Sequence, residues 1–229
     1  MKFSDLEHSM TLPDYTELPG GFTNNFVRRV GLMNVVKSGP TVEAECKWYR
    51  AYRDKNDIPK IYSADQNGVT MEYIPSDGTF NLDEMLQLIE KYREYPRLND
   101  QTFYGYRHRI KEHLLENPIH GGAKLLASLS HLDLPATFCH GDLSVNNVLP
   151  NTEGLKLIDP NYHSNFGSYW LDYAKLAFSA KFYKGDVSLY NDIMTRTGCP
   201  KVLIASECVR VATYRARFNF VSENLINEL

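Results

Sequence analysis

The sequence lacks the features that mark several large classes of protein. None of its apolar runs is long enough to span a membrane, and its first residues do not form a signal-peptide pattern. The formal net charge is only −3, so no basic excess points to nucleic acid. The chain also has no internal repeat and no low-complexity segment. These absences predict a cytoplasmic protein that binds neither membranes nor nucleic acid.

Cysteine and histidine are few and scattered. The four cysteines include no C-x-x-C pair and have no histidine at the spacing of a zinc site, and the seven histidines do not cluster. We therefore expect reduced, mostly buried thiols and no metal site made by the protein alone. The cysteines are Cys46, Cys139, Cys199 and Cys208.

What the chain does have is the composition of an ordinary globular protein. Its 229 residues are 43% hydrophobic and 23% charged. A chain of this length can bury a sizeable core, and it suits either one large domain or two small lobes.

The most informative stretch runs from Cys139 to Pro160. It contains the tripeptide His140-Gly141-Asp142 and, five positions after that aspartate, Asn147. A second aspartate, Asp159, ends the apolar run 155–158. Two carboxylates and one amide thus stand close together in the sequence.

A hairpin is expected to bring these groups together in space. Asn-Thr-Glu-Gly at 151–154 predicts a turn between two short strands, 147–149 and 155–158. The two aspartates and Asn147 then lie near one end of the hairpin. Phosphoryl transfer needs such a group, because one carboxylate orients the attacking hydroxyl while an amide oxygen and a second carboxylate hold magnesium against nucleotide phosphates. A turn rich in Asn and Asp, without chemistry, is the alternative.

These residues resemble the catalytic loop H-G-D-x-x-x-x-N of the kinase-like phosphotransferases, which include aminoglycoside phosphotransferases and choline and ethanolamine kinases. Protein kinases carry a related H-R-D loop and a D-F-G motif. Here Gly141 replaces the arginine, and Asp159 is followed by Pro160-Asn161. Both differences favour the small-molecule branch of the family.

The resemblance implies a fold and a reaction. The fold is α+β, a two-lobed protein-kinase-like fold with an antiparallel-sheet lobe at residues 1–75 and a mainly helical lobe at 76–229. The reaction is transfer of the γ-phosphate of ATP to a hydroxyl of a small molecule, with Mg²⁺ as cofactor. In this resemblance Asp142 aims the nucleophile, and Asn147 and Asp159 hold the metal.

A turn rich in glycine stands between the first two expected strands. Its glycines, Gly20 and Gly21, let backbone N–H groups approach phosphate oxygens, although hairpin turns use such pairs routinely. With Thr23 and Asn24 the turn resembles the nucleotide-covering loop of the choline-kinase branch. Aromatic and β-branched residues predict the strands of this lobe at 15–18, 26–30, 33–36, 60–64 and 69–74.

Lys37 follows two valines at the end of the third expected strand. It is similar to the kinase lysine that contacts the α- and β-phosphates, although a lone lysine is more often a solvated one. Helical spacing predicts a helix over 41–53, and the resemblance gives it the carboxylate that pairs with the lysine. We choose Glu45 as that partner and keep Glu43 as a rival.

The segment from Thr70 to Pro75 resembles the hinge strand, whose backbone would hydrogen-bond the adenine, so Glu72 and Ile74 are candidate nucleotide contacts. Pro75-Ser76-Asp77-Gly78 is the predicted boundary between the lobes. Beyond it the periodicity is helical, over 82–92, 103–115 and 123–132.

The C-terminal part is helical in period and rich in aromatic residues. In the family, Asp172 opens a helix and ties it to the catalytic loop. Four aromatic residues either bind a quaternary ammonium by cation–π contact or form core, namely Tyr162, Trp170, Tyr183 and Tyr190. The short C-terminal part leaves open whether the acceptor pocket is open or is completed by a second subunit in a homodimer.

Several functions fit these residues. The acceptor is a sugar, an amino alcohol or an aminoglycoside, and the run Asp172–Ser179 resembles kinases associated with surface polysaccharide building blocks. A nucleotide-binding pseudokinase scaffold and a protein kinase are the rival classes. The residues do not distinguish ATP from GTP.

Overall fold

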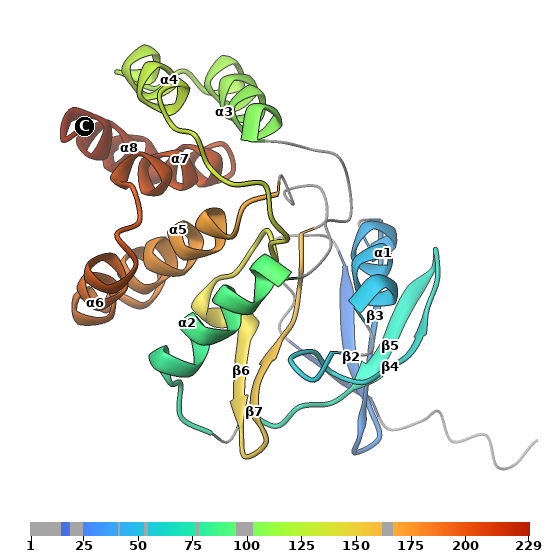
Figure 1. The fold of residues 1–229 in the computed structure, drawn as a ribbon. Coiled ribbons are helices and arrows are strands. Elements are labelled where there is room, and N and C mark those ends of the chain that lie inside the picture. The colour runs from blue at the N-terminus through green and yellow to red at the C-terminus, as the bar shows by residue number, and fades with distance from the viewer. Residues whose placement is uncertain are drawn as a thin grey trace, which may run out of the picture. The chain divides into compact units, whose positions relative to one another are not determined.

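The computed structural model describes residues 15–18, 25–40, 42–52, 55–76, 78–94, 103–161 and 167–229. The chain divides into two compact units, Met1–Pro75 and Ser76–Leu229. Figure 1 shows the helices and strands of both units. The fold is α+β, as predicted, with the strands concentrated in the first unit and the helices in the second.

The first unit is built on one antiparallel sheet. Its five strands lie in the order β1-β2-β3-β5-β4. One helix, α1 (Val42–Tyr52), packs on β4 and β5 and buries Cys46 and Tyr49 completely. The strands are β1 (Tyr15–Glu17), β2 (Phe26–Val30), β3 (Asn34–Ser38), β4 (Ile61–Ala64) and β5 (Gly68–Glu72).

The third strand is longer than its sequence suggested. It was expected over 33–36, with Lys37 near its end, but β3 continues to Ser38. Lys37 pairs with Val27 on one side and with Val69 on the other. Since ladder hydrogen bonds on both sides hold the chain extended, pairing with two neighbours carries the strand past its valines. The lysine therefore lies within a central strand.

Two helices form the centre of the second unit. Almost every residue of α5 (Tyr169–Ser179) and of α7 (Lys201–Ala212) is buried, and the two helices pack against each other. Figure 1 shows α7 and α8 side by side. The other helices are α2 (Leu82–Lys91), α3 (Phe103–Glu116), α4 (Gly122–Ser130), α6 (Val187–Thr197) and α8 (Phe218–Asn227), with short turns η2 (Tyr92–Glu94) and the π-helical η5 (Ala180–Lys184).

The predicted hairpin forms the only other sheet among the described residues. Its strands are β6 (Val148–Asn151) and β7 (Gly154–Leu157), while Asn147 lies just before β6 in the 3₁₀ turn η3 (Val145–Asn147). Gly78 donates its N–H to the carbonyl of Pro150 at 3.1 Å, and a Cβ at Gly78 would come within 2.9 Å of the Asn151 backbone. Only glycine fits this close approach.

The sequence predicted buried, reduced cysteines and no membrane-spanning segment. All four cysteines are free and buried, and burial raises the pKa of each thiol. Within the described ranges, no helix combines the length and apolar character needed to cross a membrane.

Core packing in the second unit predicts a clear difference between two leucines. Leu125 in α4 is completely buried, whereas Leu115 in α3 is 73% exposed. Leu125→Ala leaves a cavity and should lower the free energy of unfolding by about 3 kcal/mol. The matched Leu115→Ala should change it by less than about 0.5 kcal/mol.

Urea unfolding followed by circular dichroism measures both variants. A shifted midpoint with an unchanged slope is the expected result for Leu125→Ala. Equal midpoints for the two variants would contradict the packing described here.

Candidate active site

The loop that carries the H-G-D motif is anchored to helix α5 by one buried carboxylate. Asp172, which is completely buried, accepts hydrogen bonds from the backbone N–H groups of His140 (2.7 Å) and Gly141 (3.0 Å). The expected tie between this helix and the loop is therefore present. Burial raises the pKa of Asp172 to about 7, and the two N–H donors act in the opposite direction.

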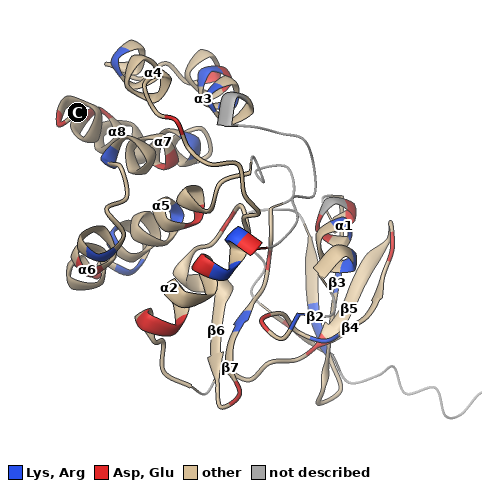
Figure 2. Cartoon of the chain, viewed as in Figure 1, with Lys and Arg blue, Asp and Glu red and all other residues tan. Residues whose placement is uncertain are grey.

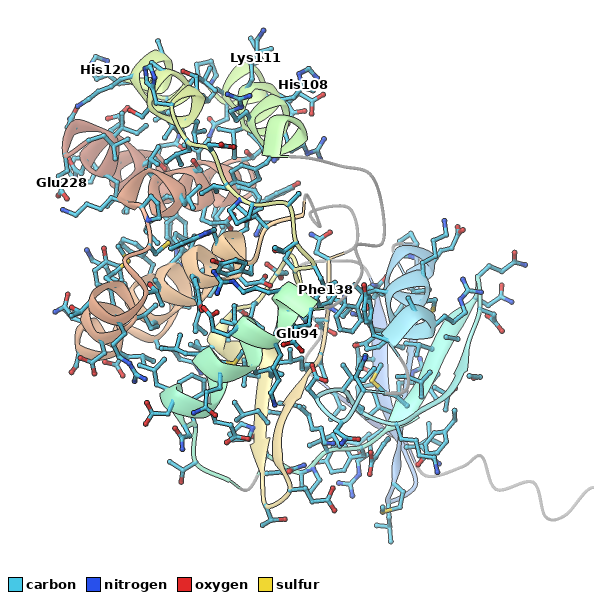
Figure 3. All side chains as sticks on the ribbon, viewed as in Figure 1. Glu94, His108, Lys111, His120, Phe138 and Glu228 are labelled. Carbon is cyan, nitrogen blue, oxygen red and sulfur yellow. The ribbon has the colours of Figure 1, made fainter. Side chains whose placement is uncertain are left out.

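Apolar contacts fix the approach to the loop. Phe138, labelled in Figure 3, is buried and packs edge-on against Tyr92 with 4.7 Å between ring centroids. Val145 donates its N–H to Ser179 Oγ of α5 at 2.9 Å. The loop is thus held to the helical core before and after its aspartate.

Asp142 and Asn147 contact each other directly. Asn147 Nδ2 donates to the Asp142 backbone carbonyl at 2.8 Å and lies 3.3 Å from Asp142 Oδ2. With Nδ2 used in this way, Oδ1 of Asn147 has no hydrogen-bond partner among the described residues. An amide oxygen in this position suits a hard cation.

Asp159 lies beside Asn147 because of the hairpin. Ile158, the residue before it, donates its N–H to the Asn147 carbonyl at 3.0 Å, and Asn161 donates to the His140 carbonyl at 3.0 Å. The backbone of Asp159 has a φ of 56°, in the left-handed region. No other described residue except glycine has a positive φ, so strain is concentrated at a candidate functional residue.

Two cations surround the Asp142 carboxylate, and neither was singled out from the sequence. Lys175 Nζ of α5 lies 2.9 Å from Oδ1, and the Arg210 guanidinium of α7 lies 3.2 Å from the same oxygen. Burial raises the pKa of Asp142, but Lys175 and Arg210 outweigh it, so the pKa lies well below its ordinary value. Figure 2 shows acidic and basic residues close together on both helices.

His140 is completely buried, and burial lowers its pKa to about 4 although nearby Asp142 and Asp159 favour the charged form. The side chain is therefore neutral at neutral pH. This supports a role in bracing the loop.

In the first unit, Lys37 and Glu45 form a buried ion pair. Lys37 Nζ lies 2.8 Å from Glu45 Oε1 and 2.7 Å from Oε2, and Asn25 Nδ2 is 3.4 Å from Oε1. The rival carboxylate, Glu43, is exposed and pairs with Lys47 at 3.2 Å. The structure thus places Glu45, and not Glu43, against Lys37.

The two candidate hinge residues differ in their backbone contacts. Glu72 donates its N–H to the Lys60 carbonyl at 2.9 Å, so this donor already belongs to the sheet. Ile74 follows the end of β5, and its backbone has no hydrogen-bond partner among the described residues. Of the two, Ile74 therefore has the backbone groups that suit recognition of a base.

Other sequence candidates have a different outcome. Five of them lie outside the described residues, namely Gly20, Gly21, Thr23, Asn24 and Tyr162.

Two of the aromatic candidates are already engaged by cations of the chain, whereas Trp170 stacks on Tyr169 with 5.4 Å between ring centroids. Lys175 and Arg215 lie over the Tyr183 ring, at 5.7 and 5.5 Å from its centroid, and Lys181 lies 4.6 Å from that of Tyr190.

The donor set fits a magnesium ion that is completed by nucleotide phosphates and water. No group of three or more His, Cys, Asp or Glu residues that could hold a metal occurs in the part of the chain that the structure describes. Asn147 and Asp159 offer two oxygen ligands of the kind Mg²⁺ takes from proteins.

Comparison with family models gave no match to this chain, and comparison with curated proteins gave none either. Comparison with solved structures did find the same fold. The choline kinase LicA from Streptococcus pneumoniae superposes with a TM-score of 0.65 at 16% identity, over 94% of each chain. The GDP and kanamycin complex of APH(2'')-IIia superposes with a TM-score of 0.64 at 14% identity, over 96% of this chain and 94% of the other.

A third structure extends the pattern. The ADP-bound aminoglycoside phosphotransferase APH(2'')-Ib gives a TM-score of 0.61 at 13% identity, over 98% of this chain and 95% of the other. The chain therefore has the two-lobed, kinase-like fold of the small-molecule kinases, which confirms the fold inferred from the sequence.

The buried histidine generates a pH prediction. The unfolded chain protonates His140 below its ordinary pKa of 6.5, whereas the folded chain does so only below about 4. The stability that comes from the neutral side chain is complete above the higher value and is lost as the pH falls toward the lower one, by up to about 3 kcal/mol. His140→Gln removes this titration.

Urea unfolding of both proteins across that pH window measures the difference, because all other groups are common to the two. The stability of the wild type should fall more steeply with acid than that of the variant. Parallel curves would show that His140 titrates normally in the folded chain.

Proposed function

We propose that the chain is an ATP-dependent phosphotransferase that moves the γ-phosphate of Mg·ATP to a hydroxyl of a small molecule. The observation that carries the proposal is the contact between Asp142 and Asn147, with Asp159 held beside them by the hairpin. These three residues belong to a chain with a kinase-like fold, which supports a catalytic role for them.

In the proposed reaction, Asp142 orients the acceptor molecule. Its carboxylate accepts a hydrogen bond from the acceptor hydroxyl and aims that oxygen at the γ-phosphorus. The hydroxyl oxygen forms the new bond to phosphorus, the bond to the bridging oxygen breaks with its electrons leaving on ADP, and the hydroxyl proton is released to solvent. Orientation is the main contribution of a group with so low a pKa.

Each unit has its own proposed role toward the nucleotide or the metal. Lys37, fixed by Glu45, contacts the α- and β-phosphates, and the backbone of Ile74 contacts the base. Asn147 and Asp159 hold Mg²⁺, which neutralises charge on the phosphates when bound. The Gly20–Asn24 loop is assigned to the phosphates by resemblance alone.

The surroundings of two tyrosines bear on the class of acceptor. A quaternary ammonium needs an open aromatic face, but Tyr183 and Tyr190 already have lysine or arginine over their rings. This favours a sugar, or an amino alcohol without a quaternary ammonium, over choline. The resemblance of the run Asp172–Ser179 is what supports a role in surface polysaccharide synthesis in the cytoplasm. An aminoglycoside acceptor is the alternative, because two of the structures with this fold are aminoglycoside phosphotransferases.

A nucleotide-binding scaffold without catalysis is the second alternative. Such a protein needs no complete set of chemical groups, and here both carboxylates and the amide are present. The geometry thus favours an enzyme.

Substitution of Asp142 tests the reaction directly. Labelled γ-phosphate of ATP, and separately of GTP, is offered to a panel of sugars, amino alcohols and aminoglycosides with Mg²⁺. We expect label on one class of solute and a fall of about 100-fold or more in Asp142→Asn, because the aimed hydrogen bond is lost. Asp133→Asn, an exposed position of the same unit, is the matched control.

Transfer that survives in Asp142→Asn would overturn the catalytic assignment. Nucleotide binding with no transfer to any solute would support the scaffold, and label on protein would support a protein kinase.

Two lysine–glutamate pairs among the described residues of the first unit give a second test. Lys37→Met should lower kcat/KM for ATP by about 10- to 100-fold, because a charge-assisted contact to the phosphates is lost. Lys47→Met removes the exposed partner of Glu43 and should leave the constant unchanged. Thermal unfolding of both variants identifies any loss of folded protein, and equal kinetic effects would exclude the assignment of Lys37.

A further inference from the structure

The two oxygens of the Asp142 carboxylate have different surroundings. Oδ1 faces two cations, Lys175 Nζ at 2.9 Å and the Arg210 guanidinium at 3.2 Å. Oδ2 lies 3.3 Å from Nδ2 of the Asn147 amide, and no other hydrogen bond to this oxygen occurs among the described residues. The two cations therefore lie at one oxygen of the carboxylate, and Asn147, a candidate metal ligand, lies at the other.

Burial separates the cations from the oxygen they hold. The side chain of Lys175 is 6% exposed and that of Arg210 is 13% exposed, whereas that of Asp142 is 32% exposed. Asp142 is thus the solvent-facing end of a buried cluster, and its cations lie on the inner side.

The arginine is itself held in place by a buried carboxylate. Glu207 Oε2 accepts from Arg210 Nε at 3.1 Å and from its terminal nitrogen at 2.8 Å. The Tyr106 hydroxyl of α3 donates to Glu207 Oε1 at 3.2 Å, and Lys175 Nζ lies 3.9 Å from Oε2. Two acids balance two bases, and residues from three helices fix one side chain of the loop.

We propose that Lys175 and Arg210 are positioning residues of the phosphotransfer, and that they clamp Oδ1 of Asp142 so that Oδ2 is the oxygen that receives the acceptor hydroxyl. The inference rests on the proposed function, since it concerns the same carboxylate. The clamp prevents the carboxylate from rotating about its Cβ–Cγ bond.

The clamp matters because phosphoryl transfer depends on alignment. A displacement of about 1 Å in a reacting group can cost about 100-fold in rate. Buried ion pairs by themselves add little net stability, so stabilisation alone is a weak reason for four charged side chains to meet here. The geometry assigns them instead to the orientation of one group.

A double-mutant cycle separates positioning from a structural role. Lys175→Met should lower the single-turnover transfer rate by about 10- to 100-fold with an unchanged Kd for nucleotide. Lys175→Arg should recover part of the loss, and Lys184→Met, an exposed lysine nearby, should match the wild type. In the Asp142→Asn background, Lys175→Met should change the remaining rate by less than about 3-fold, because the positioned group is gone.

The same loss in both backgrounds would show a structural role and overturn the inference. If Lys175→Met does not fold, Arg210→Lys replaces it in the double-mutant cycle. That substitution keeps the positive charge but removes the planar guanidinium group.

A second readout does not depend on the acceptor. Slow hydrolysis of Mg·ATP uses water in place of the acceptor. Its rate should show the same pattern of losses in the double-mutant cycle of Lys175→Met and Asp142→Asn. Nucleotide binding without transfer or hydrolysis in the wild type would refute the proposed function. Crystal structures of wild type and Lys175→Met would then decide the clamp: a rotated Asp142 carboxylate in the variant supports it, and an unchanged one refutes it.

Discussion

The second unit depends on a buried carboxyl group that the backbone of the catalytic loop holds. Asp172 is satisfied by two backbone N–H groups of the catalytic loop, so displacement of the loop would leave a buried carboxyl group without these hydrogen bonds. Lys175 stands three residues later on the same helix and reaches the side chain of Asp142. A single helix, α5, thus sets both the backbone path of the loop and the direction of its carboxylate.

This arrangement makes the helical core part of the catalytic geometry. Arg210 and Glu207 come from α7, which packs against α5 and α8, and Tyr106 comes from α3. Any shift of α7 relative to α5 would separate the two cations that share one oxygen. Because close-packed helices move little, the core supplies the rigidity that an aimed hydrogen bond needs.

Local sequence predicted the parts of the site that local chemistry determines. Asp142 and Asn147 precede one hairpin and Asp159 follows it, so their spacing places them together wherever that hairpin forms. Lys175 and Arg210 escaped prediction because they reach Asp142 from 33 and 68 positions away, through packing that no periodicity reveals. A lysine within the apolar run of α5 was the one signal, since a buried lysine requires a partner. The end of β3 was missed for a related reason, because its neighbours in the sheet extend it.

At Asp159, the proposed function and the stability of the fold favour different residues. Its left-handed backbone costs about 1 kcal/mol for any residue with a Cβ, and glycine would avoid most of that cost. Selection of random variants for heat resistance alone would therefore enrich Asp159→Gly, at the very position assigned to magnesium. At this residue a more durable protein and a working one are different sequences, so directed evolution for thermostability should hold position 159 fixed.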